Sequence, residues 1–130
     1  MSEENVLVLI KPDGVALELV DVVKAKLEAR NLTLVKDICR TLSREKILLW
    51  RPEKCTEDYF DAYVVFLTSA SVYVMLWKGS NAIEIARAMK GKARPKSGLR
   101  GVYTTSRIRN VLHTSDTNEE TKFEEGIFFG

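Results

Sequence analysis

One histidine, His113, is the side chain best suited to chemistry in this chain of 130 residues. An imidazole has an ordinary pKa of about 6.5, so its free ring nitrogen can act at pH 7 as a base, a ligand or a nucleophile. A single histidine cannot build a histidine metal cage. The spacing alone also leaves open a purely structural role, in which His113 simply ends the apolar pair Val111-Leu112.

The segment around His113 is strongly basic. The net charge of the whole chain is only +2, yet no acidic residue occurs from Ile85 to Ser115, so the remainder of the chain is net acidic. The cations of this segment are Arg87, Lys90, Lys92, Arg94, Lys96, Arg100, Arg107 and Arg109. A neutral histidine beside a cluster of cations indicates that the chain handles phosphate.

Side chains must hold that phosphate, because the chain contains neither a GxxxxGK[ST] loop nor a GxGxxG fingerprint. Arginine is well suited to this task, since its planar fork matches the geometry of phosphate oxygens. A nucleic-acid surface is the weaker interpretation of the basic segment, because no RNP-like aromatic strand motif accompanies it.

Length and composition predict one domain over residues 1–130, with 45% hydrophobic residues to fill its core. The two cysteines, Cys39 and Cys55, lack metal-ligand or redox spacing, which favours a reducing compartment and a cytoplasmic protein. The N-terminus is acidic and the apolar run over residues 6–10 is short. We therefore expect neither a signal peptide nor a membrane span.

Hydrophobic periodicity predicts alternating strands and helices. Strands are expected at 6–10, 32–42, 71–77 and 111–113. Helices are expected from about residue 16 to Asn31, from a Ser43 cap to Trp50, from Thr56 to Leu67, from Ser80 or Asn81 to Gly91, and over 118–125. Lys11 to Gly14 is typical of a turn, and 91–101 of a loop with a short helix after it.

Several short motifs occur in an order that resembles one enzyme family. They are Lys11-Pro12-Asp13-Gly14 after a strand, the Tyr59-Phe60 pair, an arginine in the helix before Gly91, Arg100-Gly101, and Asn110 to Asp116 (NVLHTSD). From about Val6 to Phe129, this set is similar to the nucleoside diphosphate kinases. The NxxHxSD pattern is its most specific part.

The resemblance implies an α+β, ferredoxin-like βαββαβ fold, with a four-stranded antiparallel sheet covered by helices. It also implies an enzyme that moves the γ-phosphate of a nucleoside triphosphate to a nucleoside diphosphate. In the family this is a ping-pong reaction through a phosphohistidine, which here would form on His113.

Site roles follow from the same resemblance. His113 matches the nucleophile, Glu124 the acid behind its other ring nitrogen, and Ser115 a supporting partner near the histidine. Lys11, Arg87 and Arg100 match cations on the phosphates, Asn110 and Lys11 match groups at the ribose, and Tyr59 takes the place of an aromatic ring that stacks on the base. Mg²⁺ is expected to arrive bound to the substrate phosphates, without a metal site on the protein.

The chain also departs from the family pattern. Arg51 stands where a tyrosine beside the histidine is usual, and Ala93 stands where a phosphate-binding threonine is usual. Arg107 replaces a valine under the base, and Thr114 replaces the usual glycine after the histidine. The loop from Pro95 to Arg100 is shorter than usual, and the common C-terminal tail is nearly missing. These changes leave an alternative open, a catalytically weakened module that only binds a nucleotide or a partner. The expected assembly is a homo-oligomer, at least a dimer, with a hexamer as a further option.

Overall fold

Four antiparallel strands form the sheet in this computed structural model, which describes residues 3–130. The strands are β1 (Glu3–Ile10), β2 (Thr33–Arg40), β3 (Val72–Ser80) and β4 (Leu112–Thr114). Their order across the sheet is β2-β3-β1-β4, so β1 and β3 are central and β2 and β4 are edges. This arrangement confirms the predicted ferredoxin-like α+β fold.

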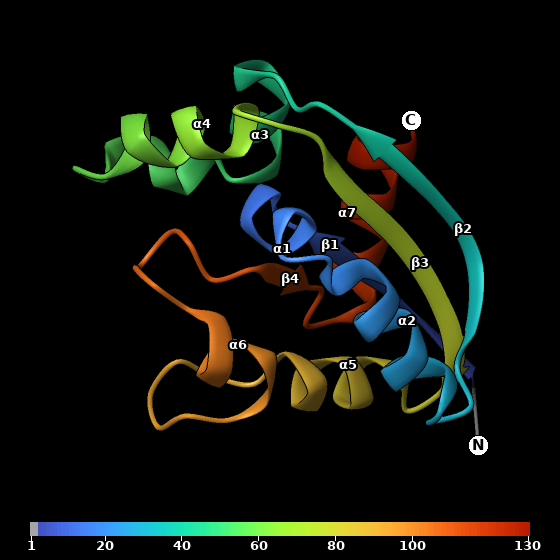
Figure 1. Cartoon of the computed structure of the whole chain (residues 1–130). Helices are drawn as coiled ribbons and strands as arrows, with labels where there is room; N and C mark the ends of the chain where they lie inside the picture. Colours follow the sequence, from blue (N-terminus) through green and yellow to red (C-terminus); the bar gives the residue numbers. More distant parts are fainter. Residues whose placement is uncertain (1–2) are drawn as a thin grey trace.

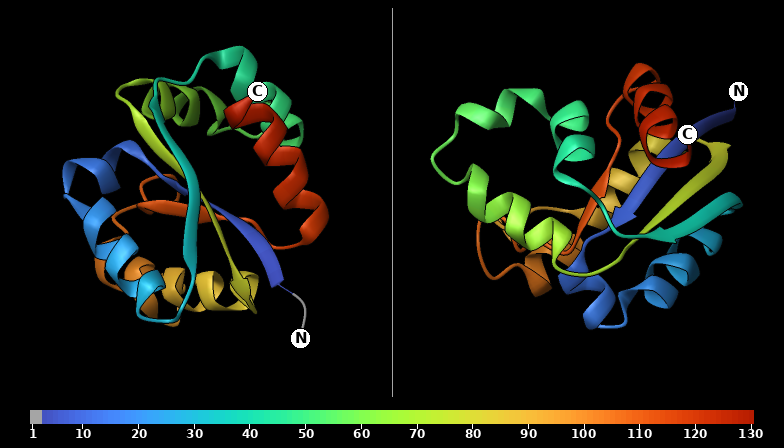
Figure 2. Two further views of the ribbon diagram at one scale, coloured as in Figure 1. Left: turned by 90° about the vertical axis from the view of Figure 1, so that its right-hand side faces the viewer. Right: turned by 90° about the horizontal axis from the view of Figure 1, so that it is seen from above.

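Helices cover both faces of the sheet (Figures 1 and 2). They are α1 (Pro12–Ala16), α2 (Leu19–Glu28), α3 (Arg44–Trp50), the short 3₁₀ helix η1 (Pro52–Thr56), α4 (Phe60–Thr68), α5 (Ala82–Lys90), α6 (Gly98–Tyr103) and α7 (Asn118–Phe129). Val6 and Val8 of β1 pack with α2 and α5, whereas Leu7 and Leu9 pack with α3, α4 and α7. Because side chains of a strand alternate between faces, burial on both faces explains the uninterrupted apolar run of β1.

The turn predicted for Lys11 to Gly14 is instead the start of α1. Pro12 occupies the first helical turn, where its missing N–H costs nothing, and Asp13 adds a negative charge at the helix N-terminus. The single helix predicted from about residue 16 is therefore two helices. Glu18, with a φ of 60°, separates α1 from α2.

Thr56 does not begin a helix, although an acidic pair follows it. It ends η1, and α4 begins only at Phe60 with Tyr59 as its N-cap residue. The predicted Ser43 cap is confirmed, since its hydroxyl accepts a hydrogen bond from the backbone N–H of Lys46. A serine side chain can accept a hydrogen bond at the start of a helix, as Ser43 does for α3. Pro52 instead begins the 3₁₀ helix η1, and that helix includes Thr56.

The other boundaries differ by a few residues. β3 runs through Ser80, so Asn81 is the residue before α5, and it adopts a left-handed conformation without a side-chain cap. The short helix expected after residue 101 is α6, which starts earlier, at Gly98. α7 continues past its predicted end, because Phe128 is buried in the core beside Trp50. Within residues 3–130, no helix has the length and apolar character that crossing a membrane requires.

Candidate active site

β4 carries His113 at the edge of the sheet, where it pairs with Leu9 of β1. The turn into β4 is held from α1: the backbone N–H of Lys11 donates to the Val111 carbonyl at 2.8 Å, and Asp13 accepts from the Val111 N–H at 3.1 Å. Val111 itself has a φ of 65°, which is strained for a β-branched residue. The Lys-Pro-Asp-Gly segment therefore clamps the backbone two residues before the histidine.

One ring nitrogen of His113 faces a buried carboxylate. Nε2 lies 2.8 Å from Glu124 Oε2 and 3.0 Å from Glu124 Oε1. Trp50 fixes that carboxylate from its other side, since its indole N–H donates to Oε2 at 2.8 Å. The edge-to-face contact of the Trp50 and His113 rings, with centroids 5.0 Å apart, keeps the imidazole from tilting.

The other ring nitrogen, Nδ1, lies 3.2 Å from the Arg51 guanidinium. Guanidinium N–H groups only donate and an ionised carboxylate only accepts, so the proton of the neutral ring is on Nε2. Nδ1 therefore carries the lone pair of the ring, which accepts from Arg51. It lies at the wall of a cavity of about 200 Å³ that Lys11, Arg51 and Arg100 line together with His113.

Burial controls the charge states of these groups. Burial and then the positive charge of Arg51 hold the pKa of His113 well below its ordinary value, so the ring is neutral at pH 7. Burial raises the pKa of Glu124 to about 6, which still leaves the carboxylate mostly ionised at that pH. The arrangement is a neutral nucleophile backed by an anion and faced by cations.

Lys11 is a buried amine within this cavity. Its Nζ donates to Asn110 Oδ1 at 2.6 Å, so two residues that were predicted at the ribose and phosphates do lie together. Burial, followed by the charge of Arg100, lowers the pKa of Lys11 to about 7. An amine with so low a pKa regains its proton when an anion binds beside it.

The structure separates the two arginines that were predicted on the phosphates. Arg100 donates to the Leu112 carbonyl at 2.9 Å and lines the His113 cavity. Arg87 instead lines a neighbouring cavity of about 560 Å³, and its Nε lies 3.4 Å from Asp116. Arg100 belongs to both cavities, so Arg87 reaches the site only from its outer side.

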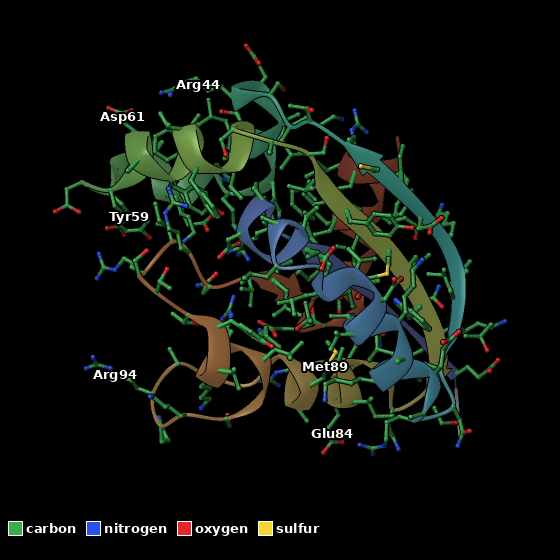
Figure 3. All side chains as sticks on the ribbon, in the orientation of Figure 1. Arg44, Tyr59, Asp61, Glu84, Met89 and Arg94 are labelled. Atoms are coloured by element: carbon green, nitrogen blue, oxygen red, sulfur yellow. The ribbon has the colours of Figure 1, made fainter. Side chains whose placement is uncertain are left out.

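Tyr59, the residue before α4, is among the residues that line the His113 cavity (Figure 3). Its ring is half-buried and is covered by the Arg107 guanidinium, 4.9 Å from the ring centroid. Arg107, which stands where the family usually has a valine, thus covers part of the Tyr59 ring surface that was predicted to stack on a base.

Ser115 does not contact His113. Its hydroxyl accepts from the Leu7 N–H at 2.9 Å and lies 2.6 Å from the Thr121 hydroxyl, while its own N–H donates to the Leu7 carbonyl. The hydrogen bonds of Ser115 in this structure therefore go to β1 and α7 and not to the imidazole. Ser115 instead anchors the chain after β4 to β1 and to α7, the helix that supplies Glu124.

The residue types and their spacing did not point to Trp50, whereas the family pattern did place Arg51 beside the histidine. The sequence predicts only that a helix ends near Trp50, although a buried indole N–H needs a partner. Lys90 was also overlooked as an individual residue: it is half-buried, and burial and Arg100 lower its pKa. Trp50 is adjacent to Arg51 in the sequence, and that adjacency was the signal that could have pointed to it.

Among the described residues, those that line the His113 cavity include few side chains that bind hard metal ions. The residues of the described chain that line the His113 cavity include cations, aromatic rings and one amide, but no carboxylate. Glu120 and Glu124 lie near Nε2, on the side of the ring opposite the cavity, where Glu124 is occupied by hydrogen bonds. A hard cation such as Mg²⁺ prefers phosphate and carboxylate oxygens, so it fits this cavity only as part of a phosphate complex.

Comparison with known proteins agrees with this geometry. The family model described as nucleoside diphosphate kinase matches residues 4–130. A nucleoside diphosphate kinase of Brevibacillus brevis is 36% identical over 130 residues, which cover 97% of this chain and 88% of the relative. One from Frankia casuarinae is 38% identical over 134 residues, covering 99% and 97%.

Solved structures show the same fold. A nucleoside diphosphate kinase from Encephalitozoon cuniculi superposes with a TM-score of 0.89 at 27% identity, covering 98% of this chain and 89% of the other. One from Aquifex aeolicus gives a TM-score of 0.88 at 20% identity, covering 99% and 96%.

Proposed function

Because this chain belongs to the nucleoside diphosphate kinase family and is an enzyme of the phosphotransferase class, we propose that it transfers phosphate through a phosphohistidine on Nδ1 of His113. The observation that carries the proposal is the pairing of Nε2 with Glu124, which leaves the Nδ1 lone pair at the wall of a cationic cavity. The reaction moves the γ-phosphate of a nucleoside triphosphate to the histidine and then to a nucleoside diphosphate.

Charge placement supports the chemical step. When Nδ1 bonds to phosphorus the ring becomes cationic, and the ionised Glu124 offsets that charge through Nε2–H. Lys11 and Arg100 offset the negative charge of the phosphoryl oxygens, and Asn110 orients Lys11. A module that only bound a nucleotide would have no use for a buried acid in register behind the histidine, which argues against the weakened alternative.

The cavity supports a bound nucleotide that spans it from Tyr59 to His113. We infer that the base stacks against Tyr59 with Arg107 beside it, and that Asn110 and Lys11 reach the ribose. Every base offers a π face, so this contact predicts broad base tolerance. Arg87 acts from the outer cavity on the far side of Arg100.

The family's kinase reaction needs a divalent metal, and we infer that Mg²⁺ supplies it as part of the nucleotide complex. The absence of carboxylates among the described residues of the cavity supports entry with the phosphates. The exposed free thiols of Cys39 and Cys55 support a reducing, cytoplasmic location.

A second copy of the chain is the proposed partner. β2 is an edge strand whose side chains are mostly exposed, among them Val35 and Ile38 at 48% and 37%. An apolar edge strand is a template for pairing with another chain unless something covers it. We propose a homodimer as the minimum assembly, with a hexamer held less firmly because the 95–100 loop is short.

Labelling tests the catalytic proposal. Incubation with γ-³²P-labelled Mg-ATP is expected to label the protein on its only histidine, with a bond that survives alkali and is lost in acid. Addition of an unlabelled nucleoside diphosphate is expected to remove the label as nucleoside triphosphate. Label on a serine, or label that persists in His113→Ala, would refute the proposal.

A further inference from the structure

Arg51 is held beside the histidine by its backbone and an aromatic ring, with only a long ion pair to an acid. Its backbone lies at the junction of α3 and η1, where its N–H donates to the Ile47 carbonyl at 2.7 Å. Its guanidinium lies 4.9 Å from the Trp50 ring centroid, and its Nη1 is 3.9 Å from Glu53, the outer limit of an ion pair. The charged end is therefore free to change partners while the backbone stays in place.

The contact between Arg51 and Nδ1 is incompatible with attack. The single lone pair of Nδ1 accepts from the guanidinium at 3.2 Å, and an attacking nucleophile must direct that same lone pair at phosphorus from a distance of about 3–3.5 Å. The guanidinium occupies the space that phosphorus needs. Arg51 must leave Nδ1 before His113 can react.

Two buried N–H groups without acceptors indicate where the Arg51 guanidinium can move. The Nε–H of Arg51 is buried without an acceptor in the described chain, and the same holds for the Nε–H of Arg100, across the same cavity. Buried donors without acceptors are costly, and a phosphoryl group brings three acceptor oxygens into the space between them. The arginine fork matches these oxygens, and the Arg51 side chain, 28% exposed, has room to rotate.

We propose that Arg51 is a further catalytic residue with two positions: it caps the Nδ1 lone pair in the free protein, and it moves onto the phosphoryl oxygens during transfer. The inference rests on the proposed function of His113. In the step, the bond from Nδ1 to the γ-phosphorus forms, and the bond from that phosphorus to the bridging oxygen breaks. The electron pair leaves with the nucleoside diphosphate, and the Nε2 proton stays between the ring and Glu124.

Two measurable consequences follow. The cap lowers the reactivity of His113 toward small electrophiles in the free protein, because the lone pair is engaged. The second position stabilises the phosphorylated protein relative to the free one, which raises the equilibrium constant for phosphoenzyme formation from Mg-ATP. A charge-assisted hydrogen bond of this kind changes an equilibrium by about tenfold to a hundredfold.

Three variants separate these effects. Arg51→Met keeps the length and apolar stem of the side chain without its donors, and Arg51→Lys keeps the charge without the fork. Arg44→Met is the matched control, because Arg44 begins the same helix and, like Arg51, pairs with an acid and an aromatic ring, Asp61 and Phe60, but lies outside the cavity (Figure 3). Far-ultraviolet circular dichroism confirms that each variant is folded.

The first measurement is the rate of carbethoxylation by diethyl pyrocarbonate without nucleotide, followed by the ultraviolet absorbance of N-carbethoxyhistidine. That signal reports on His113 alone because the chain has one histidine. The second is the phosphoenzyme equilibrium constant at a set ratio of Mg-ATP to Mg-ADP. We expect Arg51→Met to carbethoxylate several times faster and to lower the constant by about tenfold or more, Arg51→Lys to give intermediate values, and Arg44→Met to match the unmodified protein.

An unchanged carbethoxylation rate or an unchanged equilibrium constant in Arg51→Met overturns the inference. If that variant does not fold, Arg51→Lys decides by the same two measurements, with values equal to those of the unmodified protein overturning it. Failure of the proposed function looks different: the unmodified protein then takes no label from Mg-ATP, whatever the carbethoxylation rates show.

Discussion

At the scale of single residues, the site depends on which ring nitrogen of His113 carries the proton. Glu124 decides this, because both its oxygens face Nε2 and it has no proton to give at pH 7. Trp50 contributes indirectly by holding one of those oxygens. The proton of the ring is thus placed on Nε2 before any substrate arrives, so the reaction needs no change of tautomer.

Replacing Glu124 with glutamine is expected to remove the charge behind the ring. The amide oxygen can still accept from Trp50 Nε1–H and His113 Nε2–H, but the neutral amide does not offset the positive charge that the ring gains when Nδ1 bonds to phosphorus. We expect phosphoenzyme formation to slow by about 10²-fold or more, measured by rapid quench. Glu125→Gln is the control, since that side chain pairs with Lys36 at the surface. Equal rates in the two variants would contradict the assigned role.

Lys11 is expected to make nucleotide binding depend on pH. Its pKa is lowered to about 7 in the free protein, and bound phosphates raise it, so binding takes up a proton, about half a proton at pH 7. As pH rises above 7, the free protein loses that proton and the Kd for Mg-ADP increases, by up to about tenfold per pH unit. Calorimetry in buffers of different ionisation enthalpy measures the uptake. It should disappear in Lys11→Met.

At the scale of elements, the segment between α5 and α6 determines how Arg100 reaches β4. Gly91 ends α5 with a φ of 68° and a ψ of −156°, a conformation open essentially to glycine alone. The backbones of Lys92 and Ser97 then bond to each other in both directions and close the loop. This closure presents α6, and with it Arg100, to the carbonyl of Leu112.

Gly91→Ala is expected to destabilise the protein by about 1–3 kcal/mol, because an added Cβ would lie 2.0 Å from the Ser97 carbonyl oxygen. Gly126→Ala is the opposite case, since no atom lies within 4 Å of its Cβ position in the helix α7. Gly126→Ala is expected to raise the free energy of unfolding by about 0.5–1 kcal/mol. Urea unfolding measures the change in the free energy of unfolding for each variant. A Gly91→Ala protein as stable as the unmodified protein would show that the segment between α5 and α6 can rearrange.

At the scale of the whole molecule, the residues around His113 and the edge strand β2 lie in different parts of the sheet. The face with α3 and α7 holds the groups around His113, while the edge strand β2 lies two strands away from β1 and remains open (Figure 2). The proposed pairing of copies along β2 therefore leaves the cavity accessible to substrate.

Ile38→Lys is expected to convert the proposed dimer to a monomer, because it places a charge on the apolar part of the β2 edge. Val65→Lys, at a 68% exposed position on α4, is the control that adds the same charge elsewhere. Light scattering over a concentration series measures the mass. A monomer for the unmodified protein at all concentrations would refute the dimer, and a hexamer that persists on dilution would refute the weak-hexamer prediction.

The resemblance to a family implied the fold class and much of the site, while local patterns predicted the individual elements. Apolar runs predicted all four strands within a few residues, and the Ser43 cap and the Gly91 stop were confirmed. The eleven-residue spacing from His113 to Glu124 also survives, because both lie on either side of a single tight connection, from β4 to α7. Such features depend on neighbours in the chain, which the sequence lists directly.

Long-range packing determined the features of the site that neighbouring residues in the chain do not determine. Trp50 and Arg51 contact α7 and β4 from positions more than sixty residues away, and no local pattern encodes that meeting. Arg87 is drawn outward by Asp116, and Ser115 is used by β1 instead of the histidine. Residue types alone predicted a histidine among cations. Only the tertiary structure, by burying His113 between an acid and a guanidinium, decided which nitrogen is free and what covers it.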